Sequence, residues 1–403
     1  MSMPKTKLLL TSLVFAGLGS SAIAEQPPRI EIGAPIPITG PYAADGQVMQ
    51  QAIELAVDQL NAAGGVNGSE VGVRVFDIGD LTPDKLQAAA SELLDRQGVS
   101  VLINGYGGMG PDIPAFCNRD QPYLNNNATS AVVDLTMRLG CTNIFMAADV
   151  DQSYGRATFE QIMALGLDFS EQRVAILHGP YDWEVGFTDS VEHEATSVGW
   201  SVVLKEEVPY DTTQWSATMQ KLRMGQPDLI IFESLDPVSA STFLEQFRRA
   251  PINGAAVYAG YLMSTPALES MIAAGDLNGV LGMTLSAHRP GEEGEAFADL
   301  WRAKFDEEPP FSIAAQVFDE VKLWADAATR AGDATDFARV KEELANSSFE
   351  GLTGVLTFNE QFFVPVGDAT QPSQLVQVID GSVVRLMVGS EKVGEFVPPA
   401  WME

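Results

Sequence analysis

The sequence predicts an α/β protein of two doubly wound lobes, each a parallel sheet covered by helices on both faces. Short, continuously apolar segments alternate with longer amphipathic segments, which is typical of parallel strands buried on both faces. This alternation runs through the chain in two successive series. The chain of 403 residues is also long enough for two domains, since one domain usually takes about 100–200 residues.

The first series opens with an apolar strand at 29–38 and a helix at 46–65, whose apolar residues recur at helical spacing along one face. Pro83 suits the first turn of a second helix, which ends at Gly98. The other elements expected in this series are strands at 71–77, 99–104, 122–127 and 142–148, and a short helix that ends at Phe116.

The second series begins near Asp149 with a helix at 152–169. Five apolar strands are expected at 173–179, 201–208, 228–234, 255–260 and 279–286, and helices lie between them at 185–199, 213–225, 237–250 and 265–275. The chain closes with helices at 294–308, 312–332 and 336–347 and strands at 354–359, 373–380 and 382–389.

This order of elements predicts how the chain divides between the lobes. We expect lobe 1 to comprise 25–147 plus 287–353, and lobe 2 to comprise 148–286 plus 354–403. Three hinge strands, near Ala147, Ser286 and Thr357, should join the two lobes.

The first 24 residues have the three parts of a secretory signal peptide. Lys5 and Lys7 give a basic start, a short apolar stretch follows, and Ala22-Ile23-Ala24 supplies a small-x-small cleavage pattern. We therefore predict cleavage after Ala24 and export to the periplasm. The apolar stretch is too short for a membrane-spanning helix, and no cysteine follows it to carry a lipid anchor.

Charge and cysteine content limit the partners. The whole chain has 24 basic and 54 acidic residues, and cleavage after Ala24 removes two lysines, which leaves 22 against 54, a net charge of −32. Such a surface repels nucleic acid.

The two cysteines, Cys117 and Cys141, suit one disulfide in an oxidising compartment. Two free buried thiols are the alternative.

The segment "INGYGGMGP" (103–111) contains a G-x-G-x-x-G pattern, which raises the possibility of a dinucleotide-binding dehydrogenase. In such enzymes the pattern follows the first strand of its unit. Here it follows the third expected strand, and an exported protein has little access to nicotinamide cofactors. We interpret the loop as a turn lining a cleft, where glycines let backbone N–H groups approach a ligand.

Catalytic and metal-binding patterns are weak. The three histidines are far apart, no cluster has zinc spacing, and there is no G-x-S-x-G nucleophile elbow. We therefore predict neither an enzyme nor a cofactor or metal site. In open α/β sheets, ligands bind outside the carboxyl ends of the strands, so two lobes should hold a ligand between facing edges.

Several segments resemble type I periplasmic binding proteins of the leucine/isoleucine/valine-binding class. These are "IGAPIPITGPYAADGQVMQQAIELAVDQLNAAGGVNG", "ATSAVVDL", "TTQWSATMQKLRMGQPDLIIF" and "FEGLTGVLTFNE", and the likeness runs from Ile30 to about Asn359. The resemblance implies two hinged lobes, a small solute bound between them and delivery to the permease of an ABC importer. A monomeric protein without cofactors is the expectation.

The resemblance also implies positions for the ligand site. In the family, a serine in the glycine loop and the "AT" of a later loop hold the ligand carboxylate, and these positions correspond to Tyr106 and to Ala128 and Thr129. The ammonium-binding glutamate corresponds to Tyr261. An aromatic of lobe 2 corresponds to Trp183 or Val185, and we prefer Trp183 because it keeps an aromatic side chain. Tyr106 and Tyr261 both depart from the family pattern, so the resemblance implies the fold and not the identity of the solute.

Further site residues are suggested by their places in the chain. They are Tyr42 in "TGPYAADG", Gly107 and Gly108 in the glycine loop, Asp151 and Tyr154 after the first crossover, and Asp236 at a strand end. Thr129 could equally be a simple cap of the following turn, and Asp236 could be a helix N-cap. A box of aromatics and carboxylates suits a cationic or zwitterionic solute through cation–π contact, or an aromatic solute through stacking. The resemblance implies an amino acid or an amino-acid-like solute, and a tyrosine in the glycine loop also occurs in amide-binding relatives. A sensor feeding a membrane receptor is the alternative function, and an exported enzyme is a weaker one.

Overall fold

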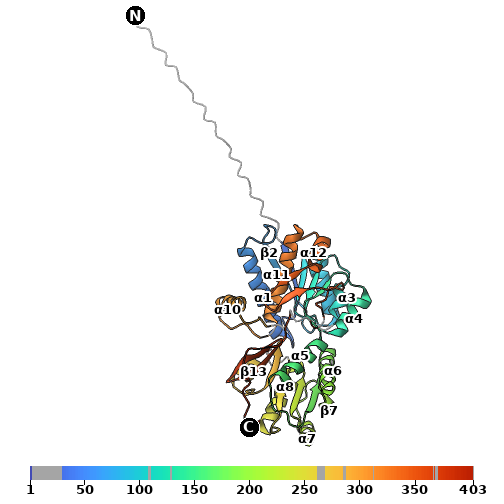
Figure 1. Ribbon diagram of the computed structural model, residues 1–403. Helices are drawn as coiled ribbons and strands as arrows, with labels where there is room; N and C mark the ends of the chain where they lie inside the picture. The colour runs from blue at the N-terminus through green and yellow to red at the C-terminus, as the bar shows by residue number, and fades with distance from the viewer. Residues whose placement is uncertain are drawn as a thin grey trace.

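The structure is a computed structural model that describes Met1 and residues 30–107, 110–127, 129–260, 268–284, 287–311, 313–365, 367 and 371–402. It has two main sheets, which lie in the upper and lower parts of Figure 1. The predicted leader, with its cleavage point after Ala24, lies outside the described residues apart from Met1. Within the described residues, no helix combines the length and the apolar character that a bilayer span requires.

The sheet of lobe 1 has five parallel strands in the order β2-β1-β3-β4-β5. Helices α1 and α11 pack on one face, and α2, a following π-helical turn and α3 pack on the other. The strands are β1 (Ile30–Ile36), β2 (Val71–Asp77), β3 (Val101–Asn104), β4 (Tyr123–Asn125) and β5 (Ile144–Met146). The helices are α1 (Ala43–Ala62), α2 (Pro83–Ala90), the π-helical Ser91–Arg96, α3 (Asp112–Phe116), α4 (Ser130–Leu139), α10 (Glu292–Phe305), α11 (Ala314–Ala331) and α12 (Phe337–Ala345).

The sheet of lobe 2 has eight strands in the order β15-β14-β13-β10-β9-β8-β6-β7. Its strands are β6 (Arg173–His178), β7 (Ser201–Glu207), β8 (Leu229–Glu233), β9 (Ala256–Tyr258), β10 (Leu281–Thr284), β13 (Gln374–Ile379), β14 (Ser382–Val388) and β15 (Glu391–Lys392). The first five are parallel and the last three add antiparallel pairs. Helices α5 (Asp151–Ala164) and α6 (Asp182–Ser197) cover one face, and α7 (Ser216–Gly225), α8 (Pro237–Arg249) and α9 (Glu269–Ala273) cover the other.

The predicted fold class, a two-lobed α/β protein with parallel sheets, is confirmed. Helix α4 was not expected, because only a turn was predicted after Thr129. Thr129 caps its start by accepting a hydrogen bond from the N–H of Val132, and Gly140 ends it in the left-handed conformation at φ 61°. A Thr and a Gly eleven positions apart were the local signal for this helix.

The chain passes between the two sheets three times. The first passage follows β5, the second lies between β10 and α10, and the third precedes β13. The hairpin of β11 (Ser348–Glu350) and β12 (Val355–Thr357) forms its own small sheet, and Leu356 and Val364 pack in the core of lobe 1. This packing favours a third passage after Val364. The domain boundaries given above stay predictions, and Ser286 lies outside the described residues.

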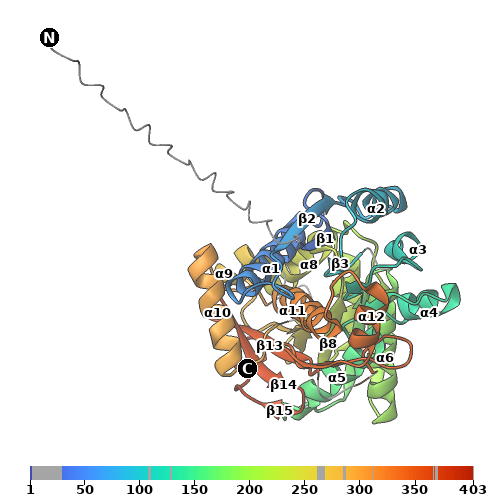
Figure 2. The same ribbon diagram turned by 90° about the horizontal axis from the view of Figure 1, so that it is seen from above.

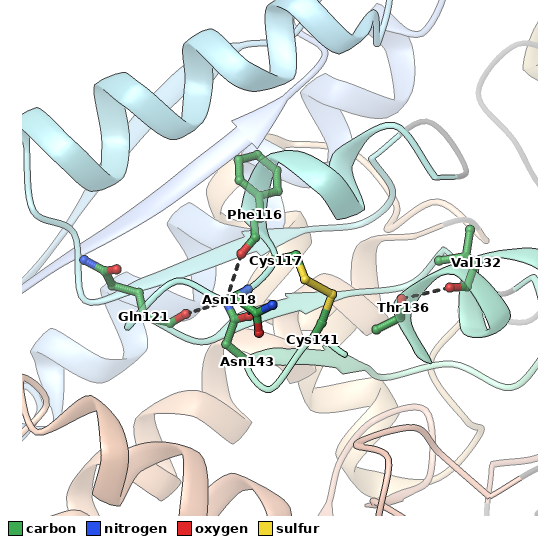
Figure 3. The surroundings of a disulfide bond; sticks show 8 residues. All are labelled: Phe116, Cys117, Asn118, Gln121, Val132, Thr136, Cys141 and Asn143. Carbon is green, nitrogen blue, oxygen red and sulfur yellow. Dashed lines mark hydrogen bonds between the residues drawn. A yellow bond between two sulfur atoms is a disulfide. The ribbon is translucent and has the colours of Figure 1, made fainter. Parts of the chain in front are cut away.

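Cys117 and Cys141 form a disulfide at one edge of lobe 1, with their Cα atoms 5.1 Å apart, as Figure 3 shows. Asn143 supports the same loop. Its side-chain amide donates to the carbonyls of Phe116 and Gln121 at 3.0 and 2.9 Å, and its Oδ1 accepts from the N–H of Asn118 at 2.8 Å. The disulfide prediction is therefore confirmed, and an oxidising compartment is consistent with it.

Removing this disulfide should destabilise the protein. The cysteines are 24 positions apart, and closing a loop of that size contributes about 3 kcal/mol in the chain-entropy description. The double variant Cys117→Ser/Cys141→Ser should lose that much unfolding free energy in urea titrations of the oxidised proteins. With dithiothreitol added, wild type should fall to the level of the variant. Equal midpoints for oxidised wild type and variant would contradict the prediction.

Candidate functional site

The carboxyl ends of the parallel strands in the two sheets carry loops that meet between the lobes, where ligands bind in open α/β sheets. On lobe 1, Tyr42 is the residue before α1, and Tyr106 follows β3. Their rings pack edge to face with centroids 6.3 Å apart. The hydroxyl of Tyr106 donates to the carboxylate of Asp45 at 2.5 Å, so this ring is fixed in place. Burial raises the pKa of Asp45, although this hydrogen bond opposes the rise.

On lobe 2, Tyr181 precedes α6 and Tyr210 follows β7, and their ring centroids are 5.4 Å apart. Glu184 is hydrogen-bonded to both of these residues. Its carboxylate accepts from the N–H of Leu235 at 2.6 Å, from the N–H of Tyr181 at 2.8 Å and from the hydroxyl of Tyr210 at 2.9 Å. Burial raises the pKa of Glu184 to about 7, so its charge changes close to neutral pH.

The two surfaces touch through Tyr42. Burial is the main cause that raises the pKa of the Tyr42 phenol. Three residues of lobe 2 raise this pKa further: Tyr181 and Glu184 through their charges, Tyr181 also through a hydrogen bond, and Asp236 through its charge. Four tyrosines, two from each lobe, therefore form a continuous group, in which Tyr106 packs on Tyr42 and Glu184 is bound by Tyr181 and Tyr210. We call Tyr42, Tyr106, Tyr181 and Tyr210 the tyrosine cluster.

A family model described as periplasmic binding protein matches residues 29–382 of this two-lobed chain. The chain belongs to the periplasmic binding protein family. Members of this family are solute-binding proteins and not enzymes. The resemblance to the leucine/isoleucine/valine-binding class is confirmed.

Two relatives illustrate this class. The leucine-, isoleucine-, valine-, threonine- and alanine-binding protein of Pseudomonas aeruginosa is 23% identical over 354 residues, which cover 88% of this chain and 91% of the relative. A Leu/Ile/Val-binding protein homolog of Brucella abortus is 24% identical over 365 residues, which cover 88% and 92%.

Solved structures share the fold. A crystal structure from Silicibacter pomeroyi superposes with a TM-score of 0.84 at 23% identity, covering 93% of this chain and 100% of that one. The substrate-binding protein of Streptococcus pneumoniae in complex with isoleucine gives 0.75 at 22% identity, covering 89% and 100%. A solute-binding protein of R. palustris in complex with benzoate gives 0.74 at 18%, covering 93% and 100%.

In this periplasmic binding protein, the glycine loop packs inward. The N–H of Gly107 donates to Oδ1 of Asn127 at 3.1 Å, and the amide of Asn127 donates to Asp112 at 2.8 Å. A Cβ on Gly107 would lie 2.4 Å from the side chain of Asp112. Burial raises the pKa of Asp112 to about 6. The glycine at 107 is therefore required by a buried carboxyl group, and its N–H group is bound to Asn127, which follows β4.

Two predicted residues of the periplasmic binding protein link its lobes indirectly. Thr129 is buried and serves as the N-cap of α4. The next residue, Ser130, donates its hydroxyl and its N–H to Asp151 at 2.5 and 3.1 Å. Burial raises the pKa of Asp151, and the bonds from Ser130 oppose this. These residues hold the loop after β4 against the start of α5.

Asp236 is the N-cap of α8. Its carboxylate accepts from the N–H groups of Ser239 at 2.9 Å, of Val238 at 3.3 Å and of Asp211 at 2.7 Å. Burial raises the pKa of Asp236, but the hydrogen bonds from Ser239 and these N–H groups outweigh it, so the net pKa is lowered and the group is ionised at neutral pH. Asp236 therefore contributes negative charge beside Tyr42.

Trp183 and Tyr154 lie in the core of lobe 2. Each is 4% exposed, and their ring centroids are 5.7 Å apart. The indole N–H of Trp183 donates to Glu233 at 3.3 Å. Gly108, Ala128 and Tyr261 lie outside the described residues.

The sequence interpretation missed four residues of this site: Asp45, Tyr181, Glu184 and Tyr210. One local signal was available for part of this group. Tyr181 and Glu184 stand three residues apart at the start of α6, the spacing of a capping box. Tyr210 and Asp45 carry no such signal, because their roles depend on side chains that are distant in the sequence.

Proposed function

We propose that this chain is the solute-binding component of an ABC importer, and that it captures a small polar organic solute between its lobes. The observation that carries the proposal is the tyrosine cluster, in which Tyr42 of lobe 1 meets Tyr181 of lobe 2 beside Glu184 and Asp236. Neither lobe alone could surround a solute there, so binding should favour the closed arrangement.

The chemistry of the cluster limits the solute. Phenol rings stack on apolar or aromatic parts of a ligand and attract cations, and their hydroxyls exchange hydrogen bonds with polar groups. We infer an amino acid or an amino-acid-like molecule that is cationic, an amide or aromatic. The relatives named for aliphatic amino acids and the neighbour bound to benzoate are consistent with this range. Gly108, Ala128 and Tyr261 remain proposed contacts.

The cellular role follows from the same family. We propose that the leader is cleaved after Ala24, that the mature monomer works in the periplasm, and that it delivers its solute to a membrane permease. A permease gene beside the gene for this chain would support transport over the alternative role of a sensor for a membrane receptor.

The test begins with mass spectrometry of the solute that co-purifies with the protein from its native host. Calorimetry with that solute should then show that Tyr181→Ala weakens binding by about 1–3 kcal/mol, as for truncation of aromatic anchors at interfaces. Tyr181 is 41% exposed, so the free energy of unfolding should change by less than about 1 kcal/mol.

Val198→Ala is the matched control, because Val198 is an exposed residue at the far end of α6. Its affinity should equal that of wild type. Unchanged affinity in Tyr181→Ala, or the absence of any co-purified or added solute that closes the lobes in X-ray scattering, would contradict the proposed function.

A further inference from the structure

A cavity of about 890 Å³ lies on the hinge side of the molecule, apart from the tyrosine cluster, and none of the four tyrosines lines it. Its size is within the range of small-molecule sites, roughly 300–1,000 Å³. One wall is the face of α5 that carries Tyr154, Ala157 and Gln161, and the opposite wall is the β14–β15 turn. In Figure 2, α5 and β14–β15 lie side by side at the lower edge of the molecule. We call this cavity the hinge pocket.

All three passages between the lobes contribute to the hinge pocket. Asp149 belongs to the first passage, Arg289 to the second and Gly367 to the third. A hydrogen bond joins the first and third passages, in which the N–H of Gly367 donates to the carboxylate of Asp149 at 2.6 Å. The second is fixed to the hairpin region of lobe 1, since the N–H of Arg289 donates to the carbonyl of Leu352, also a lining residue, at 2.8 Å. A molecule in this pocket therefore contacts every segment that bends when the lobes open or close.

The charges and surfaces of the hinge pocket indicate what would bind. Its lining carries two guanidinium groups, Arg156 and Arg289, against five carboxylates, which are Asp149, Glu160, Glu292, Glu293 and Glu391. The last four carboxylates belong to exposed residues at the rim. Serine, glutamine and apolar side chains share the rest of the lining, and the apolar ones include Ala157, Ala164, Pro372 and Val393. An acidic rim over a wall that is partly apolar favours a positively charged group on a hydrocarbon body.

We propose that the hinge pocket is a second binding site for a small amphiphilic organic cation, whose binding shifts the equilibrium between open and closed lobes. A ligand changes such an equilibrium only when it binds the two states with different affinity. The pocket is built from segments that move relative to one another, so its shape differs between the states. Binding there is thereby coupled to binding at the tyrosine cluster, and the coupling is reciprocal.

The test uses the full mature chain and three probes with one ring and different charge: benzylamine, benzyl alcohol and benzoate. Calorimetry at pH 7.5 should show benzylamine binding about 10-fold more tightly than benzyl alcohol because of the acidic rim, and this preference should fall with added salt. Benzoate should not bind at this pocket. X-ray scattering should show that benzylamine changes the radius of gyration.

Variants locate the binding. Ala157→Phe fills the pocket without removing a hydrogen bond and should abolish benzylamine binding. Glu160→Gln should weaken it by about 2- to 5-fold, the range expected for one exposed charge. The matched control Glu70→Gln, at an exposed position beside β2 in lobe 1, should leave benzylamine binding unchanged.

The proposal is overturned if benzylamine does not bind, or if Ala157→Phe and Glu160→Gln both bind it as wild type does. Loss of benzylamine binding in Tyr181→Ala with retention in Ala157→Phe would place the probe at the tyrosine cluster, which also overturns it. If Ala157→Phe fails to fold, Glu160→Gln and the comparison of the three probes still test whether the hinge pocket binds the cation. None of these outcomes depends on the identity of the transported solute.

Discussion

Trp183→Ala is expected to lower the free energy of unfolding by about 3–5 kcal/mol, the cost of truncating a large aromatic side chain in a core. The indole is 4% exposed and packs against Tyr154 and Phe187, with ring centroids 5.7 and 6.0 Å away. Truncation would leave a cavity under α6 and remove the donor to the buried carboxylate of Glu233. The measurement is urea unfolding of the mature protein.

The position of Trp183 in the sequence suggests the reverse order of effects, with solute affinity reduced by about 1–3 kcal/mol and stability changed less. Because the side chain of Trp183 is buried, we expect the loss of unfolding free energy to exceed any loss of solute affinity. Trp183→Phe is the control, since it keeps a ring at the site and should cost clearly less than the alanine variant. A stable Trp183→Ala protein that no longer binds the co-purified solute would show that the indole contacts the solute directly.

Glu320→Gln is expected to make the stability of the protein less dependent on pH. Glu320 lies on α11 in lobe 1 and is 0% exposed, and its two carboxylate oxygens have no hydrogen-bond partner among the described residues. Burial, assisted by the charge of the adjacent Asp319, raises the pKa of Glu320 well above its ordinary value of 4.5. The folded protein therefore holds this carboxyl group neutral at pH values where the unfolded chain ionises it.

The sign of the effect follows from proton binding. Between the ordinary pKa and the raised one, the folded state binds one more proton than the unfolded state, so stability falls as pH rises. The loss from this group is about 1.4 kcal/mol for each pH unit in that interval. Other buried acids with raised pKa values, such as Asp319 and Asp112, add similar slopes.

The difference between wild type and Glu320→Gln isolates the single group. Urea unfolding at pH 5, 6, 7 and 8 should show that the free energy of unfolding of the variant increases relative to that of wild type as pH increases. Asp299→Asn, at an exposed position on α10, is the matched control and should follow the wild-type profile. A constant difference between Glu320→Gln and wild type across this range would show that Glu320 is ionised in the folded protein.

Much of the fold was predictable because it depends on local patterns. The run "IEIGAPI" is apolar along most of its length and therefore becomes the buried strand β1, and the helical repeat of apolar residues after Tyr42 becomes α1. The order of such elements fixes parallel sheets and hence the edge on which ligands bind. Cys117 and Cys141 were the two cysteines available for a disulfide in an exported chain, and they are paired.

The sequence by itself thus determined the fold class and the family, through patterns and motifs that are continuous along the chain, and it predicted the disulfide that the structure shows. The tertiary structure alone decided which side chains face the other lobe. Trp183 and Tyr181 are two residues apart, yet one is buried in the core of lobe 2 and the other meets Tyr42 across the lobes. Helical spacing gives each residue a direction relative to its own helix, whereas the surface that it meets depends on how two separately folded sheets are joined at the hinge.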